Sequence, residues 1–165
     1  PSLYRFFPDR EAILGELLAR HCSEMDARCA EAEKTWRIGS VADLLNNELD
    51  LQIHYYRRHP GSARMWMGGR TSPTVTGHVR ARMKNLADRI HRILTDAALI
   101  PVGTDPRAML VAVEMADRIL ELSYRRGDFD EEILDIGWRA LIAFGRDLSE
   151  GPSSGPAGNS PHSPR

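Results

Sequence analysis

The residues of this chain best suited to binding chemistry are a group of methionines and aromatic residues, six of which lie between positions 55 and 83. Methionine side chains adapt to irregular shapes, and aromatic rings supply flat apolar walls. Most of them fall on three consecutive predicted helices, so they could line a pocket for an apolar or aromatic small molecule. The alternative is an ordinary core. The candidate pocket residues are Tyr55, Tyr56, Met65, Trp66, Met67, His78, Met83 and Met115.

Histidine is the usual source of metal-binding and acid–base chemistry, but the six histidines of this sequence lack convincing partners. His54 falls on an acidic helix face, which indicates a solvated side chain. His21, His78 and His91 have no second ligand-type residue at helical spacing, and a metal site needs converging ligands. The chain has no glycine-rich phosphate loop and no nucleophile–base motif. We therefore expect no enzyme activity, no catalytic residue, no metal site and no cofactor.

The elements that would position these residues are all predicted to be helices, and nothing reads as a strand. Residues suited to begin a helix stand at Asp9, Ser40, Ser72-Pro73, Asp105-Pro106 and Asp130. Apolar residues recur at helical spacing after each of them. The sequence therefore predicts an all-α fold of about six helices, over residues 10–34, 40–58, 62–69, 73–93, 106–126 and 131–148.

The overall charge and composition exclude several classes of protein. The chain has 165 residues, enough for one domain or one domain with a tail, and a formal net charge of -1. A balance this neutral excludes a wholesale polyanion-binding surface. No apolar run approaches a membrane span of about 18 residues, and nothing resembles a signal peptide. We expect a cytoplasmic protein without a membrane partner.

Two smaller groups of residues invite a functional interpretation and do not support one. Cys22 and Cys29 are about 10 Å apart on one predicted helix, too far for a disulfide, and are expected to be small apolar side chains. A series of arginines on the helix over residues 75–93, including Arg82 and Arg89, could suggest a nucleic-acid surface. Because acidic residues lie among them, a solvated face is the favoured interpretation.

The last two predicted helices are apolar on two sides, which a helix at the surface does not need. One side is expected to face the core of the domain and the other a second copy of the chain, forming a four-helix bundle. The alternative is a helical interaction module whose broad apolar faces bind a different protein. The candidate interface residues are Val111, Ile119, Leu122, Trp138, Leu141 and Ile142.

The opening stretch, "SLYRFFPDREAIL", resembles the end of the DNA-binding domain in the tetracycline-repressor (TetR) family of bacterial transcriptional regulators. The resemblance rests on Leu3-Tyr4, Phe7, Arg10 and the Glu-Ala-Ile-Leu that follows. Phe6 departs from the pattern, since the family often has histidine there. The rest of the chain resembles the family only in layout, with a long connecting helix, helices around a pocket, and two final dimerising helices.

This resemblance implies a ligand-responsive transcriptional regulator, more often a repressor than an activator. Ser2, Tyr4 and Arg10 would contact DNA, with the basic side chain and a helix N-terminus holding the phosphate backbone. The chain would be a homodimer that binds operator DNA through an N-terminal domain of which only the end is present. Residues 1–9 would be the remnant of that helix-turn-helix domain, 10–149 the effector-binding and dimerisation domain, and 150–165 a disordered tail.

Overall fold

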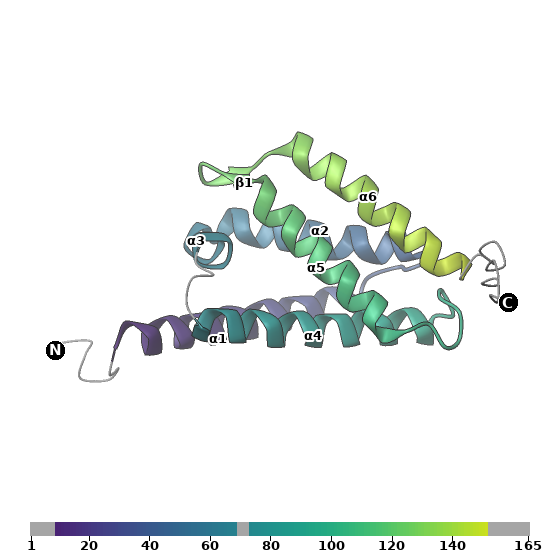
Figure 1. Cartoon of the computed structure of the whole chain (residues 1–165), viewed down its shortest axis with the longest axis horizontal. Helices are drawn as coiled ribbons and strands as arrows, with labels where there is room; N and C mark the ends of the chain where they lie inside the picture. The colour runs from purple at the N-terminus through teal and green to yellow at the C-terminus, as the bar shows by residue number, and fades with distance from the viewer. Residues whose placement is uncertain (1–8, 69–72, 152–165) are drawn as a thin grey trace, which may run out of the picture.

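The computed structural model describes residues 9–68 and 73–151, and this part of the chain is mostly helical, as the all-α prediction expected (Figure 1). Within it lie six helices and one short hairpin. The helices are α1 (Arg10–Glu33), α2 (Val41–Arg58), α3 (Pro60–Gly68), α4 (Pro73–Asp96), α5 (Pro106–Ser123) and α6 (Glu131–Glu150).

Several predictions concern residues outside these ranges. Ser2 and Tyr4, two of the three expected DNA contacts, are not among the described residues, nor is most of the predicted remnant 1–9 or of the predicted tail 150–165. The third expected contact, Arg10, is the first residue of α1 and is exposed.

Local side-chain caps explain where the helices begin. Asp9, Ser40 and Asp130 each accept hydrogen bonds from backbone N–H groups of the first turn, which otherwise have no partner inside the helix. The cap of α2 is reciprocal. The Ser40 hydroxyl accepts from the Asp43 N–H at 3.1 Å, while the Asp43 carboxylate accepts from the Gly39 N–H at 3.0 Å. The predicted helix starts at these positions are therefore confirmed.

The end of α5 differs from the prediction, which extended this helix to the arginine pair before Gly127. α5 ends at Ser123, and a two-stranded antiparallel hairpin follows, with β1 (Tyr124–Arg125) paired to β2 (Asp128–Phe129). Its turn has φ of 53° at Arg126 and 95° at Gly127. Positive φ at both central residues defines the type I′ turn that matches the twist of a hairpin. The expectation that the chain contains no strand is wrong here.

Contacts at both ends of the hairpin explain why the chain leaves the helical path. Phe129 is 6% exposed, and its ring lies near Tyr56 and Tyr124 in the core. On the outside, Arg57 at the end of α2 pairs with Asp128 at 3.1 Å and also with Glu131. A straight continuation of α5 would forfeit the burial of the Phe129 side chain.

The helices pack so that α4 and α5 occupy the middle of the contact network. Figure 1 shows α1 and α4 side by side along one edge, and α5 running from the end of α4 up to the hairpin. α4 contacts α1 and α5, α5 packs along α6, and α2 contacts α1, α3 and α6. The core collects apolar side chains from all of them. Leucines that are at most 1% exposed include Leu18, Leu44, Leu94, Leu120 and Leu141.

Two glycines allow α6 to approach its neighbours closely. A Cβ at Gly145 would lie 2.9 Å from Val41 Cγ1 of α2, and a Cβ at Gly137 would lie 2.7 Å from Ile119 Cγ1 and Cγ2 of α5. Valine and isoleucine are stiff at χ1, so their branched carbons cannot turn aside at low cost. The absence of side chains at these two positions sets the distance of α6 from both helices.

We expect the substitution Gly145→Ala to lower the free energy of unfolding by about 1–3 kcal/mol, because the added methyl group overpacks the contact with Val41. Gly77→Ala is the matched control, since a Cβ on this other helical glycine would meet nothing within 4 Å. It should raise stability by about 0.5–1 kcal/mol through lower backbone entropy of the unfolded chain. Urea denaturation of both variants measures the difference. Equal effects would contradict the close contact.

Candidate functional site

Three of the predicted pocket residues pack around a buried histidine of α1. His21 is 4% exposed, with Nδ1 at 3.2 Å from the Tyr55 hydroxyl and Nε2 at 3.5 Å from the Tyr56 hydroxyl. The Trp66 ring centroid lies 5.5 Å from that of His21. We call His21, Tyr55, Tyr56 and Trp66 the aromatic cluster. Sequence reasoning found three of its members but left out His21, which had no obvious partner at helical spacing.

The surroundings of His21 keep its imidazole neutral. Burial, followed by the positive charge of Arg82, lowers the pKa of His21 from 6.5 to about 4. A neutral ring has one donor and one acceptor nitrogen, which suits two tyrosine hydroxyls. The cluster is therefore a junction between α1, α2 and α3, in which His21 is hydrogen-bonded to both tyrosines and packs against Trp66.

Two of the arginines expected on a solvated face of α4 instead pack against other helices, Arg82 buried and Arg89 half-buried. Arg82 is 7% exposed and pairs with Asp26 of α1, while its guanidinium lies 5.9 Å from the centroid of the Trp66 ring. Arg89 lies between two carboxylates, Glu33 at 2.9 Å and Glu48 at 2.5 Å. The prediction is wrong for both residues. Their long stems pack into the interior because α1, α2 and α5 cover more of α4 than its apolar stripe indicated.

Glu48 is the acidic residue that sequence reasoning missed. It is 4% exposed and stands on the buried face of α2 beside Leu44, Leu45 and Leu49. Burial raises the pKa of the Glu48 carboxyl, an effect that the nearby Arg89 charge opposes. A carboxylate within a run of leucines was the available signal, since acidic side chains are almost never buried without a partner.

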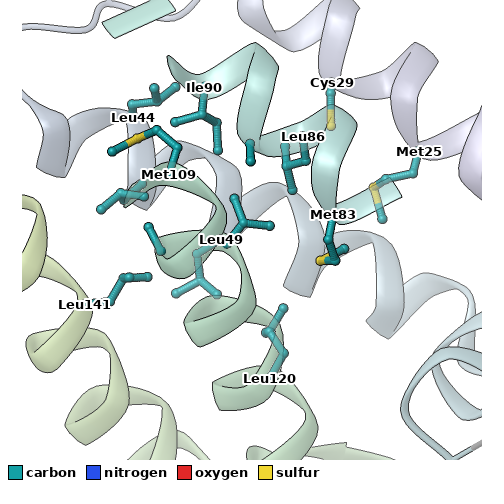
Figure 2. Close-up of a cluster of buried hydrophobic side chains, with 14 of the residues drawn as sticks. Met25, Cys29, Leu44, Leu49, Met83, Leu86, Ile90, Met109, Leu120 and Leu141 are labelled. Carbon is teal, nitrogen blue, oxygen red and sulfur yellow. The ribbon is translucent and has the colours of Figure 1, made fainter. Parts of the chain in front are cut away.

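A small cavity lies beside Glu48, between α2, α4, α5 and α6. Its volume is about 30 Å³, which is room for about one or two water molecules. Leu49, Met83, Leu86, Ile90 and Leu120 are five of its apolar lining residues, and Figure 2 shows them within one cluster of buried side chains. A typical small-molecule pocket is about 300–1,000 Å³, so a ligand would require these side chains to move apart. We call this space the inner cavity.

The wall of the inner cavity carries few polar groups. The complete lining is Leu45, Glu48, Leu49, Gln52, Met83, Leu86, Ile90, Ala112, Val113, Ala116, Asp117, Leu120 and Trp138. Among these described residues, Glu48 and Asp117 are the ionisable ones, and Gln52 adds an amide. Of the predicted pocket residues, only Met83 belongs to this lining.

Asp117 connects the inner cavity with the aromatic cluster. This residue of α5 is 5% exposed, and its carboxylate accepts a hydrogen bond from Trp66 Nε1 at 2.9 Å. Trp66 in turn lies against His21 of α1. Trp66 of α3 thus covers this position of α5. A wall group of the cavity is thus two contacts away from α1.

The remaining predicted pocket residues lie elsewhere. Met67 is 7% exposed and belongs to the core, and Met65 is half-buried against it. His78 is half-buried beside the first turns of α1, in a separate hollow that also includes Gly15. Met115 faces the outer side of α5, away from the inner cavity, so its assignment to a common pocket with Met83 is wrong.

A second, open hollow of about 620 Å³ runs between α5 and α6 on the outside of the molecule. Its lining is mostly apolar and consists of Leu110, Val111, Glu114, Met115, Arg118, Ile119, Gly137 and Ala140. Three apolar side chains on α5 and α6 are unusually exposed, Val111 at 50%, Leu122 at 44% and Ile136 at 62%. We call this surface, with Leu122 and Ile136, the outer groove.

The predicted dimer residues divide between the two sides of this helix pair. Val111 and Ile119 line the outer groove, and Leu122 is exposed one turn further along α5. Leu141 is 0% exposed within its own chain, so its assignment to an interface between copies is wrong. Trp138 lines the inner cavity and donates from Nε1 to Asn46 of α2 at 2.5 Å. The residue after Leu141, Ile142, is partly buried against the core.

Metal-ligating side chains, cysteines and long apolar helices form no further site within the described residues. Residues 9–68 and 73–151 bring no three histidine, cysteine or carboxylate side chains together as a metal site. Cys22 is half-buried and Cys29 buried, and both are free thiols. No helix within the same ranges is long and apolar enough to cross a membrane.

Comparisons with protein-family models, with curated proteins and with solved structures found no match to this chain. The candidate site consists of a small cavity with two carboxylates in its wall, the aromatic cluster of α1, α2 and α3, and an exposed apolar groove.

We expect the variant His21→Phe to flatten the dependence of stability on pH. The unfolded chain protonates His21 near pH 6.5 and the folded chain near pH 4, so stability present above pH 6.5 is lost as the pH falls. This group accounts for a loss of up to about 3 kcal/mol across that interval. Urea denaturation at about pH 7 and about pH 4.5 measures it. His54→Gln, at an exposed position, should retain the wild-type slope. An unchanged slope in His21→Phe would show that His21 titrates at the same pH in the folded and the unfolded chain, which would contradict the prediction.

Proposed function

We propose that this chain is the effector-sensing and dimerising domain of a TetR-like transcriptional regulator, acting as a repressor. The DNA-reading helices would precede α1, so that α1 connects them to the sensor. The observation that carries this proposal is the outer groove, because the last two helices expose an apolar surface that a second copy of the chain would cover. The N-terminal sequence with Leu3-Tyr4, Phe7 and Arg10, which resembles the end of a TetR DNA-binding domain, supports the same assignment.

The outer groove suits a symmetric interface. Apolar residues of the outer groove recur at helical spacing on both helices, at Val111, Met115 and Ile119 of α5 and at Ile136 and Ala140 of α6. Val111, Ile136 and Ala140 are exposed, while Met115 and Ile119 are half-buried. Two such helix pairs related by a two-fold axis would bury the surface in a four-helix bundle. Glu114 and Arg118 border the groove with opposite charges, which a two-fold axis can bring together across the interface.

The aromatic cluster provides a physical route from a ligand to the DNA-reading helices. A ligand that displaces Asp117 alters the acceptor of Trp66, and Trp66 packs on His21 of α1. In a dimer, a shift of α1 would change the separation of the two DNA-reading units. The ligand would then weaken DNA binding by the ratio of its affinities for the two arrangements.

The oligomeric state tests the outer groove. We expect the chain to sediment as a dimer and the Ile136→Glu variant as a monomer, since each interface would bury two unpaired carboxylates at a cost of about 3 kcal/mol or more. Leu17→Glu is the control, because Leu17 is 47% exposed on α1, outside the groove. A wild-type monomer would contradict the proposal and favour the second candidate function, a helical module that binds a different protein.

DNA binding tests the regulatory role directly. In the intact regulator, with its DNA-reading helices, we expect a sequence-specific gel shift on the DNA upstream of its own coding region. Arg10→Gln should weaken binding uniformly across sequences and reduce the salt slope by about one, as for the loss of one phosphate contact. Arg37→Gln is the control, since α1 separates Arg37 from Arg10 by roughly 35 Å. The absence of any specific shift would refute the regulatory proposal.

A further inference from the structure

We propose that the inner cavity binds a compact ligand with an apolar body and a protonated amine, the amine lying between Glu48 and Asp117. This inference names the chemical class of the effector and rests on the function proposed above. From the sequence we expected an apolar or aromatic ligand, without a stated charge, beside the aromatic residues of positions 55–66. The proposal differs in two respects: the ligand is positively charged, and it binds in the inner cavity.

The apolar part of the ligand follows from the lining. Most of the residues that enclose the inner cavity have aliphatic side chains, which exclude water and reward an apolar surface. Met83 and Gln52 are unbranched and have several rotatable bonds, so they can yield to an incoming group at low cost. The space of about 30 Å³ is smaller than an aromatic ring, so a ligand can enter only after such adjustments. A molecule no larger than a single ring requires the least enlargement.

The charge of the ligand follows from the ionisable groups of the wall. Both of them, Glu48 and Asp117, are carboxylates, and the described lining residues include no lysine, arginine or histidine. An anion would therefore be repelled in a medium that screens charge weakly. A ligand that lacks a hydrogen-bond donor would shield these carboxylates from water without forming a hydrogen bond to them, which costs free energy.

The Glu48 carboxylate has the capacity to accept a further hydrogen bond. Arg89 contacts two carboxylates, Glu33 and Glu48, so one guanidinium faces two acidic groups. Arg89 contacts Oε1 of Glu48, while Oε2 has the Cys29 thiol at 3.9 Å, a long contact even for sulfur. A carboxylate can accept several hydrogen bonds, and an ammonium group supplies three donors. An ammonium group in the cavity would add a second charged donor to the Glu48 carboxylate, beside that of Arg89.

Binding to the full chain, measured by calorimetry with three probes that share one ring, tests the proposal. Benzylamine carries a positive charge, toluene none and benzoate a negative charge. We expect benzylamine to bind about 10- to 100-fold more tightly than toluene, the range for one hydrogen bond to a charged group, and benzoate not to bind. Glu48→Gln and Asp117→Asn should each lose most of this preference and still bind toluene, which also shows that they fold. The amide oxygen introduced by Asp117→Asn would still accept the hydrogen bond from Trp66.

Glu114→Gln is the control, because Glu114 lies on the outer side of α5. It should retain the full preference for benzylamine. Equal affinity for benzylamine and toluene, or a preference that survives in both cavity variants, would overturn the proposal. A dimer and a specific DNA shift without any amine preference would refute the ligand class and leave the proposed function intact. A preference for the amine in a protein that binds no DNA would support the ligand class and refute the proposed function.

Discussion

The ion pairs of Arg89 impose the constraint on which most of the interior depends. This side chain of α4 contacts Glu33 of α1 and Glu48 of α2, so it joins three helices at one point. Removing charges from water costs several kcal/mol for each ion, and the cost is recovered only when the partners are correctly placed. A shift of α1 or α2 along α4 would separate these charges in a poorly solvated space. The pairing therefore fixes α2 and α4, two of the helices that surround the inner cavity, relative to each other and to α1.

α5 carries the two surfaces that a ligand-responsive dimer would need. Its inner side supplies Asp117 to the wall of the cavity, and its outer side supplies Val111 and Ile119 to the outer groove. One helix cannot move away from a ligand on one side without altering the surface on the other. The close approach of Gly137 to Ile119 also means that α6 would follow α5. In the proposed dimer, the cavity and the interface would thus respond to each other through packing alone.

The sequence predicts local features well and contacts between distant helices poorly. Helix starts depend on a few neighbouring residues, so the Asp9 and Ser40 caps were identified correctly. The hairpin after Ser123 was missed because an arginine followed by glycine suits both a helix end and a type I′ turn. The placement of Arg89 depends on Glu48, 41 positions away, and no periodicity within α4 carries that information. Only the carboxylate among the leucines of α2 pointed to it.

The same limit explains the misplaced pocket. Counting aromatic residues located the aromatic cluster but could not say whether those rings line a space or fill one. In the structure Tyr55, Tyr56 and Trp66 surround His21, and their polar atoms meet His21 or Asp117. Such a cluster resists small displacements, because each partner would be left buried without a hydrogen bond. It lies between the cavity wall and α1, so it is better suited to transmit a change at Asp117 than to contact a ligand.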